Sequence, residues 1–431
     1  MYITSLIKSL KPSRREHWMM LAILIYSLNG VLKYYSPMPI CNALTVISAL
    51  TFIWVVLRHI NGFCLNGGTG LFYKVLILWS MCLTFHMFFI ADVRGTFTEY
   101  HGLTTWLLAY FSSPYFMPNL IPFVILAFPR NYHFDFKYLW RVMWLMCILY
   151  LCYYPFAFWS MTHYSWSFEQ IAGTEWGEKG TYGDFITNST IGITSLTPVV
   201  IMVYFKKYLN TRHWKWFLIA YVGGIFIQAF LARRGGLAMS VLYLVLAWGM
   251  YALNDKRTSK FKMVLLAAII LCLGYVLFSN MADSFLSTLI ERGDEDTRGG
   301  VEESFYADMK LQSDWIFGRG WFGEYYDPLF NKFRSTIETG YLALILRGGY
   351  LYLIPYVAVL ALTTFYGYFK SNNLFCKSIA IICLMQVISL YPSGWPAFNC
   401  FHFVVWIGVW TCNMTKIRKM TDEQIVSKLF K

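Results

Sequence analysis

The chain has 431 residues, of which 57% are hydrophobic, 19% aromatic and only 14% charged. A soluble domain carries roughly 25% charged residues, so this composition excludes an ordinary soluble globular protein. The net charge of +13 does not indicate a nucleic-acid-binding protein, because most of the excess basic residues lie in short segments between long apolar runs. The composition instead favours an all-α integral membrane protein.

The apolar residues occur in runs of about 20, the length that a helix needs to cross a bilayer. The N-terminal segment 1–16 is basic and mildly amphipathic. A full-length apolar stretch follows it, which we interpret as a first span and not as a cleaved signal peptide. The runs predict about twelve spans, at residues 17–35, 39–57, 71–90, 103–128, 138–159, 185–205, 214–231, 236–253, 261–279, 339–369, 374–391 and 396–413.

The tenth predicted span, 339–369, is too long for one simple crossing, and Gly348-Gly349 predicts that its start is a separate short helix. The longest polar segment, about 280–338, lies between the ninth and tenth spans. It is rich in aromatic residues, which disordered segments lack, so we expect it to fold against the bundle. The predicted organisation is a bundle at 1–279, a large loop at 280–338, three further spans at 339–413 and a tail at 414–431.

The distribution of charge predicts which way the bundle faces. With the N-terminus inside, 24 of the 36 basic residues but only five of the 23 acidic residues lie on the cytoplasmic side. Cytoplasmic loops of membrane proteins carry an excess of Lys and Arg. Both termini are therefore expected in the cytoplasm, and the 280–338 loop on the opposite side.

A basic pair, Arg233-Arg234, opposes this charge rule, because it falls in a short turn on the outer side and is followed by Gly235-Gly236. Charged residues kept at such positions are often functional. The alternative is that both side chains extend to the membrane interface.

The outer loop contains two further arginines that suit an anionic ligand. Arg298 precedes a helix-compatible run at 301–313, and Arg319 lies between Gly318 and Gly320. Glycines allow a tight turn, and the planar guanidinium binds two phosphate oxygens at once. A turn with a solvated Arg319 is the alternative.

Two charged residues flank the start of the tenth span. A partly desolvated carboxylate at Glu338 would have a raised pKa and could act as a base, although an acid that merely favours the helix N-terminus is equally compatible. Arg347 follows on the same apolar helix, and we expect it to face protein, an outer acid or an anionic ligand, and not lipid.

Three segments in this order resemble the O-antigen ligase and polymerase superfamily of bacterial envelope enzymes. Ala232–Gly236 resembles the family's Arg-Gly turn, and Arg298 followed by Phe317–Gly320 resembles its Arg…Gly-x-Gly loop. The run from Glu338 to Gly349 resembles a family segment that usually opens His-Asn. Glu338 stands where many ligases carry His, and this departure favours a polymerase.

The resemblance implies a GT-C-like membrane fold and an inverting, metal-independent glycosyl transfer at the periplasmic face of the inner membrane. The implied partners are membrane lipid and an undecaprenyl-diphosphate-linked oligosaccharide as donor and as acceptor, with a chain-length regulator protein as a candidate partner. Glu338 would be the base. The residues implied to bind the diphosphate and glycan are Arg233, Arg234, Arg298, Arg319 and Arg347.

Two other functions remain open on the sequence. An O-antigen ligase would transfer the glycan to lipid A-core. A flippase for lipid-linked oligosaccharides would also have many spans, but it should show two related halves and polar residues near the midplane. Neither a metal site nor a disulfide framework is indicated, because the sequence contains no CxxC or Cys/His cluster. No cofactor is expected.

Overall fold

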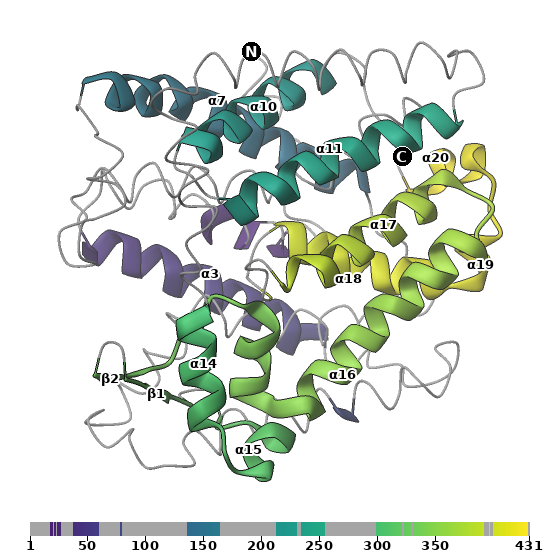
Figure 1. Cartoon of the computed structure of the whole chain (residues 1–431). Coiled ribbons are helices and arrows are strands. Elements are labelled where there is room, and N and C mark those ends of the chain that lie inside the picture. Colours follow the sequence, from purple (N-terminus) through teal and green to yellow (C-terminus); the bar gives the residue numbers. More distant parts are fainter. Residues whose placement is uncertain are drawn as a thin grey trace.

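The computed structural model describes residues 18–26 with gaps at 20 and 23, 38–59, 78–79, 136–163, 213–230, 234–254, 299–320, 323–328, 331–391, 396 and 400–429. This part of the chain is mostly helical (Figure 1). The predicted spans at 103–128, 185–205 and 261–279 lie outside the described residues, as does nearly all of 71–90. The prediction of a mostly helical protein is therefore confirmed for the described residues, whereas the membrane fold and its number of spans stay predictions.

Four helices in the first part of the chain coincide closely with predicted apolar spans. They are α3 (Met38–His59), α7 (Phe136–His163), α10 (Trp214–Phe230) and α11 (Arg234–Asn254). Tyrosine hydroxyls join three of them, because Tyr154 of α7 donates to the carbonyl of Ala220 at 2.6 Å and Tyr221 of α10 donates to that of Ser240 at 3.0 Å. These bonds satisfy polar groups inside an otherwise apolar interface.

The C-terminal part is an antiparallel arrangement of α16 (Gly340–Phe369), α17 (Leu374–Ser389) and α18 (Cys400–Asn413). Two short helices follow, α19 (Thr415–Arg418) and α20 (Asp422–Leu429). They fold back onto the start of α17, where Asp422 accepts from the backbone N–H of Leu374 at 2.9 Å and the Asn373 amide donates to the carbonyl of Ile417. The predicted tail 414–431 is thus an ordered cap on the helix bundle as far as residue 429.

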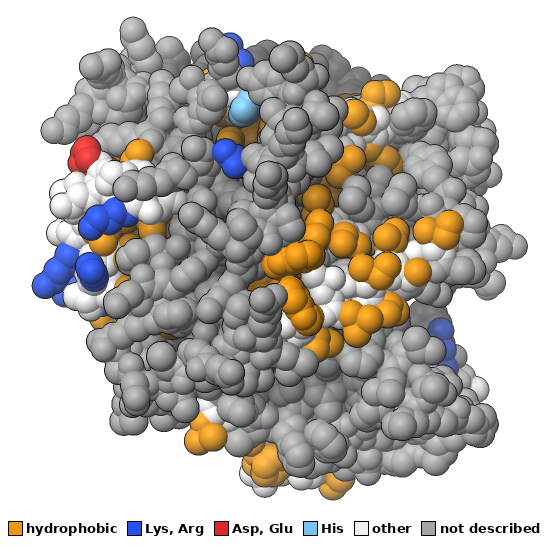
Figure 2. All heavy atoms as spheres, turned by 180° about the vertical axis from the view of Figure 1, so that it is seen from behind, with side chains coloured by type: hydrophobic (Ala, Val, Ile, Leu, Met, Phe, Trp, Pro, Cys, Tyr) orange, Lys and Arg blue, Asp and Glu red, His pale blue; other side chains and the backbone are white. Residues whose placement is uncertain are grey.

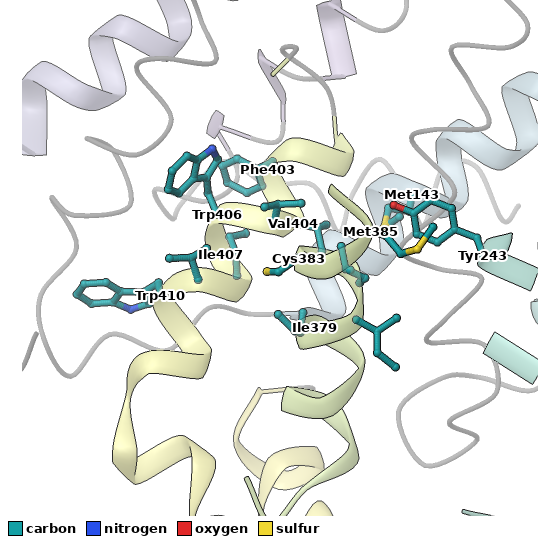
Figure 3. Close-up of a cluster of buried hydrophobic side chains, with 14 of the residues drawn as sticks. Met143, Tyr243, Ile379, Cys383, Met385, Phe403, Val404, Trp406, Ile407 and Trp410 are labelled. Carbon is teal, nitrogen blue, oxygen red and sulfur yellow. The ribbon is translucent and has the colours of Figure 1, made fainter. Parts of the chain in front are cut away.

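The main buried core lies where α17 and α18 meet the earlier helices (Figure 3). Ile379 and Cys383 of α17 face Ile407 of α18, and all three side chains are fully buried. Figure 3 also shows Met143 of α7 and Tyr243 of α11 beside Met385 of α17. Segments far apart in the sequence therefore share one apolar core.

Several helices also expose apolar side chains. On α10, Trp216, Ile219, Val222 and Phe226 are each about half exposed and recur every three or four residues, so they share one side of the helix. Figure 2 shows exposed hydrophobic side chains gathered in a band across the back of the molecule. Within the described residues, α16 is the one helix whose length and apolar composition suffice to cross a membrane.

The described part of the polar loop is folded, and this expectation is confirmed. It contains α14 (Gly299–Asp308), α15 (Gln312–Phe317) and a hairpin of β1 (Tyr325–Asp327) paired antiparallel with β2 (Lys332–Arg334). The single helix expected at 301–313 is instead two helices. The chain turns after Asp308. The Trp315 indole donates to the carbonyl of Met309 at 2.6 Å. This bond satisfies a carbonyl that would have been hydrogen-bonded within a continuous helix.

The break in α16 falls where the sequence predicts it. Gly349 has φ 63° and ψ −165°, a conformation that is essentially restricted to glycine. Gly318, at the end of α15, has nearly the same conformation, with φ 73° and ψ −173°. A side chain at Gly349 would overlap the Ile316 carbonyl, and one at Gly318 would lie 2.5 Å from the carbonyl carbon of Arg347. The loop and the broken helix therefore meet backbone to backbone.

We expect Gly349→Ala to release the loop from α16. Forcing an L-residue into this conformation costs about 1–3 kcal/mol, and the overlap with Ile316 adds roughly 1–3 kcal/mol. The measurement is the thermal unfolding of the detergent-solubilised protein, together with the rate at which a protease cleaves within 299–338.

Gly249→Ala is the matched control, because Gly249 lies within α11 and a β-carbon there meets nothing within 4 Å. Alanine favours a helix over glycine by about 1 kcal/mol, so this variant should be at least as stable as the parent. Equal behaviour of the two variants would show that the close backbone contact is unimportant.

Candidate functional site

The loop is bound to α16 through hydrogen bonds that replace those lost at the helix break. The backbone N–H of Arg319 donates to the carbonyl of Leu346 at 2.7 Å, and that of Gly320 donates to the carbonyl of Arg347 at 3.1 Å. In an unbroken helix these two carbonyls would accept from residues 350 and 351. The loop therefore supplies the donors that the first half of α16 lacks at its end.

The Arg319 guanidinium is the centre of a buried ionic cluster. Its side chain is only 1% exposed. Nη1 lies 2.5 Å from Asp308, while Nε and Nη2 each lie 2.8 Å from Asp314. The carbonyls of Glu324 and Asp308 accept from Nη1 at 2.7 Å and from Nη2 at 2.8 Å. Every nitrogen of the guanidinium thus has an acceptor within the loop.

This arrangement corrects the interpretation of Arg319 as a residue presented to an anionic ligand. Phe317–Gly320 does form a tight loop, but it turns the guanidinium inward, where Asp308 and Asp314 neutralise it. The sequence gives no indication of this, because the two acids precede Arg319 by 11 and 5 residues and lie on different helices. We assign Arg319 a structural role, in which it fixes α14, α15 and the hairpin to one another.

Arg347 lies at the end of the short helix 340–348, next in sequence to the Leu346 carbonyl that accepts from the N–H of Arg319. Its side chain is 6% exposed, which agrees with the expectation that it faces protein. A positive charge in the last turn of a helix is favoured by the helix dipole. Arg319 and Arg347, both predicted to bind substrate, are thus brought together, and the Gly320 N–H donates to the carbonyl of Arg347.

Glu338 lies at the other end of the short helix and is exposed. The role of its carboxylate as a base stays a prediction. The next residue, Thr339, is buried, and its hydroxyl donates to the carboxylate of Glu302. Sequence reasoning missed Glu302, because it lies within a run that shows only helical character. Two carboxylates, Glu302 and Glu338, therefore flank the point where the loop enters α16.

We call the point where the loop enters α16, with Glu302, Glu338 and Thr339, the rim. The hairpin of β1 and β2 lies beside it. Tyr325 on β1 is fully buried, and its hydroxyl donates to the carbonyl of Thr336 at 3.3 Å. Burial raises the pKa of Tyr325 to about 12; Asp327 and Glu338 act in the same direction and Arg334 opposes them. Tyr325 is thus protonated at neutral pH and is no candidate base. Arg334 pairs with the fully buried Asp327 at 2.8 Å, which neutralises that carboxylate.

The remaining predicted arginines lie largely outside the described residues. Arg233 and Arg298 fall in gaps at 231–233 and 255–298, and Arg234 is placed only as the first residue of α11. At the same turn, Gly236 leaves room for the side chain of Gln228, whose Oε1 accepts from Ser240 at 3.2 Å. The roles expected for Arg233, Arg234 and Arg298 therefore stay predictions.

The described residues contain no group of three or more His, Cys, Asp or Glu side chains placed to hold a metal ion. No protein-family model matches the chain, and neither does any curated protein or solved structure. The chemistry of the site therefore has to be argued from its own residues.

We expect Arg319→Met to destabilise the loop. Removing one partner of a buried ion pair costs about 3–5 kcal/mol, because the remaining charges are left buried without compensation. Protease cleavage within 299–338 should accelerate, and the amount of protein in the membrane should fall.

Lys310→Met provides the comparison, because Lys310 is exposed in the turn between α14 and α15. It should leave both measurements unchanged. If Arg319→Met instead kept parental abundance and protease resistance and lost only activity, Arg319 would be a ligand-binding residue and our structural assignment would be wrong.

Proposed function

We propose that this chain is a bacterial inner-membrane glycosyltransferase that joins undecaprenyl-diphosphate-linked oligosaccharide repeat units, and is thus a surface-polysaccharide polymerase of the O-antigen type. The observation that carries the proposal is the rim at the start of α16. There a folded, aromatic-rich loop leaves Glu338 exposed at the start of the short helix that precedes the break in α16.

Two features support a membrane location for this site. Apolar side chains are exposed on α10, and a surface of that kind is stable against lipid. At the end of the α16–α18 bundle opposite to the loop, basic side chains gather along the edge formed by the C-terminal helices (Figure 2). The exposed lysines there are Lys370, Lys416, Lys419 and Lys428. Such an excess is typical of the cytoplasmic face, which supports a periplasmic position for the loop.

In the proposed reaction, Glu338 takes the proton from a hydroxyl of the acceptor sugar. The hydroxyl oxygen attacks the anomeric carbon of the donor glycan with inversion, and the bond from that carbon to the diphosphate breaks. Undecaprenyl diphosphate leaves with the bonding electrons. Arg233, Arg234 and Arg298 would stabilise its developing charge, as oriented cations do for leaving phosphates.

The decisive experiment supplies the purified protein with a single undecaprenyl-diphosphate-linked repeat unit and no lipid A-core. A ladder of longer glycans and released undecaprenyl diphosphate are expected from a polymerase. Transfer that begins only after lipid A-core is added would identify a ligase. Movement of intact lipid-linked oligosaccharide across proteoliposomes, without new glycosidic bonds, would identify a flippase.

We predict that Arg233→Ala, Arg298→Ala and Glu338→Gln each reduce polymerisation about 100-fold or more while leaving membrane abundance intact. The first two variants remove charge from the leaving diphosphate and the third removes the base. Initial rates of ladder formation, normalised to protein by immunoblot, provide the measurement. Lys310→Ala is the control for loss of a loop cation, and full activity in all three variants would refute the site.

A further inference from the structure

One side of α14 combines a carboxylate with an aromatic ring beside the proposed active site. Glu302 and Tyr306 are four residues apart and therefore share a helix face. Tyr306 is 46% exposed, whereas Glu302 is half-buried. The Thr339 hydroxyl donates to Oε1 of Glu302, and no other hydrogen bond to this carboxylate is made within the described residues.

Tyr306 is held in place by a stack of rings that joins the loop to α16. Its ring is stacked on that of Trp315, with centroids 5.9 Å apart and an interplanar angle of 12°. Trp315 is stacked in turn on Tyr350, just after the break in α16, at 5.8 Å and 24°. A ring fixed from one side in this way loses little conformational freedom when a ligand packs on it.

Hydroxyl groups lie around the carboxylate. Tyr341, in the first turn of α16, lies near Tyr306, Glu302 and Tyr391. Tyr391, at the end of α17, is 69% exposed, and the carbonyl of Leu390 accepts from the N–H of Tyr341 at 3.3 Å. The loop and α16 therefore meet at Glu302, and the residues that follow α17 pack on the first turn of α16.

This set of groups matches the chemistry of a sugar more closely than that of lipid. A pyranose has an apolar C–H face that packs on an aromatic ring, and hydroxyls that donate to a carboxylate in charge-assisted hydrogen bonds. A lipid-facing surface would not keep a carboxylate at its centre, because a charge in hydrocarbon is costly.

We propose that Glu302, Tyr306 and Tyr341 form a binding site for a pyranose of the acceptor glycan. The proposal rests on the polymerase function above and adds a substrate-positioning site to it. Since Glu302 binds Thr339, the residue after Glu338, a sugar held there has its hydroxyls beside the proposed base. Glu302 is a binding residue in this scheme, and Glu338 takes the proton.

The test is calorimetric titration of the full-length protein in nanodiscs with the free repeat-unit oligosaccharide, released by mild acid from the lipid-linked pool of the producing cells. Glu302→Gln and Tyr306→Ala should each weaken binding about tenfold or more, the amount expected from losing one hydrogen bond to a charged group or one apolar contact. Tyr306→Phe keeps the ring and should retain most of the affinity.

Glu303→Gln is the matched control, because Glu303 is the exposed neighbour of Glu302 on a different side of α14. The affinity of this variant for the oligosaccharide should equal that of the parent. Glutamine at 302 still accepts from Thr339, so the protease resistance of the loop should also be unchanged. Failure of the parent protein to bind the oligosaccharide, or parental affinity in both Glu302→Gln and Tyr306→Ala, would overturn the proposal and leave the rings as membrane-interface residues.

The two proposals fail in different ways. Oligosaccharide binding that depends on Glu302, in a protein that makes no glycan ladder, would support the sugar site and refute the polymerase. A ladder made equally well by parent, Glu302→Gln and Tyr306→Ala would support the polymerase and refute the sugar site.

Discussion

The close backbone packing of the loop at Gly318 against α16 at Gly349 is the constraint on which the rest of the described loop depends. Both residues adopt a conformation that is essentially available only to glycine. A side chain at Gly318 would meet the backbone of Arg347 and Gly348, and one at Gly349 would meet that of Ile316 and Phe317. This closeness allows the N–H groups of Arg319 and Gly320 to reach the carbonyls freed by the break in α16. The break in α16 costs little free energy, because the loop supplies the hydrogen-bond donors that these carbonyls would otherwise lack.

The Arg319 cluster shows how an ionic interaction serves this contact. A buried guanidinium is tolerated only when it is paired and fully hydrogen-bonded, and Asp308, Asp314 and two carbonyls meet that requirement. Because its partners come from α14, α15 and the chain before β1, the cluster fixes the rim that carries Glu302 and Glu338. The charges that stabilise the loop and those proposed for chemistry are therefore different residues.

The sequence predicted the parts of this fold that depend on local pattern. Apolar runs placed α3, α7, α10, α11, α16 and α17, and the Gly348-Gly349 pair placed the break in α16. It did not predict the division of 301–313 into two helices, the inward turn of Arg319 or the bond between Glu302 and Thr339. Each of these depends on contacts between residues distant in the chain, and neither helical periodicity nor a short motif carries that information.

The backbone contact also limits how such a protein can change over evolutionary time. If the loop alone were exchanged between two homologous chains, it would lack the matching break in α16. The loop and its buried ionic cluster would then lose their backbone contacts with that helix. Viable recombination points should therefore lie before Gly299 or after Gly349, so that the loop and the first part of α16 are inherited as one block.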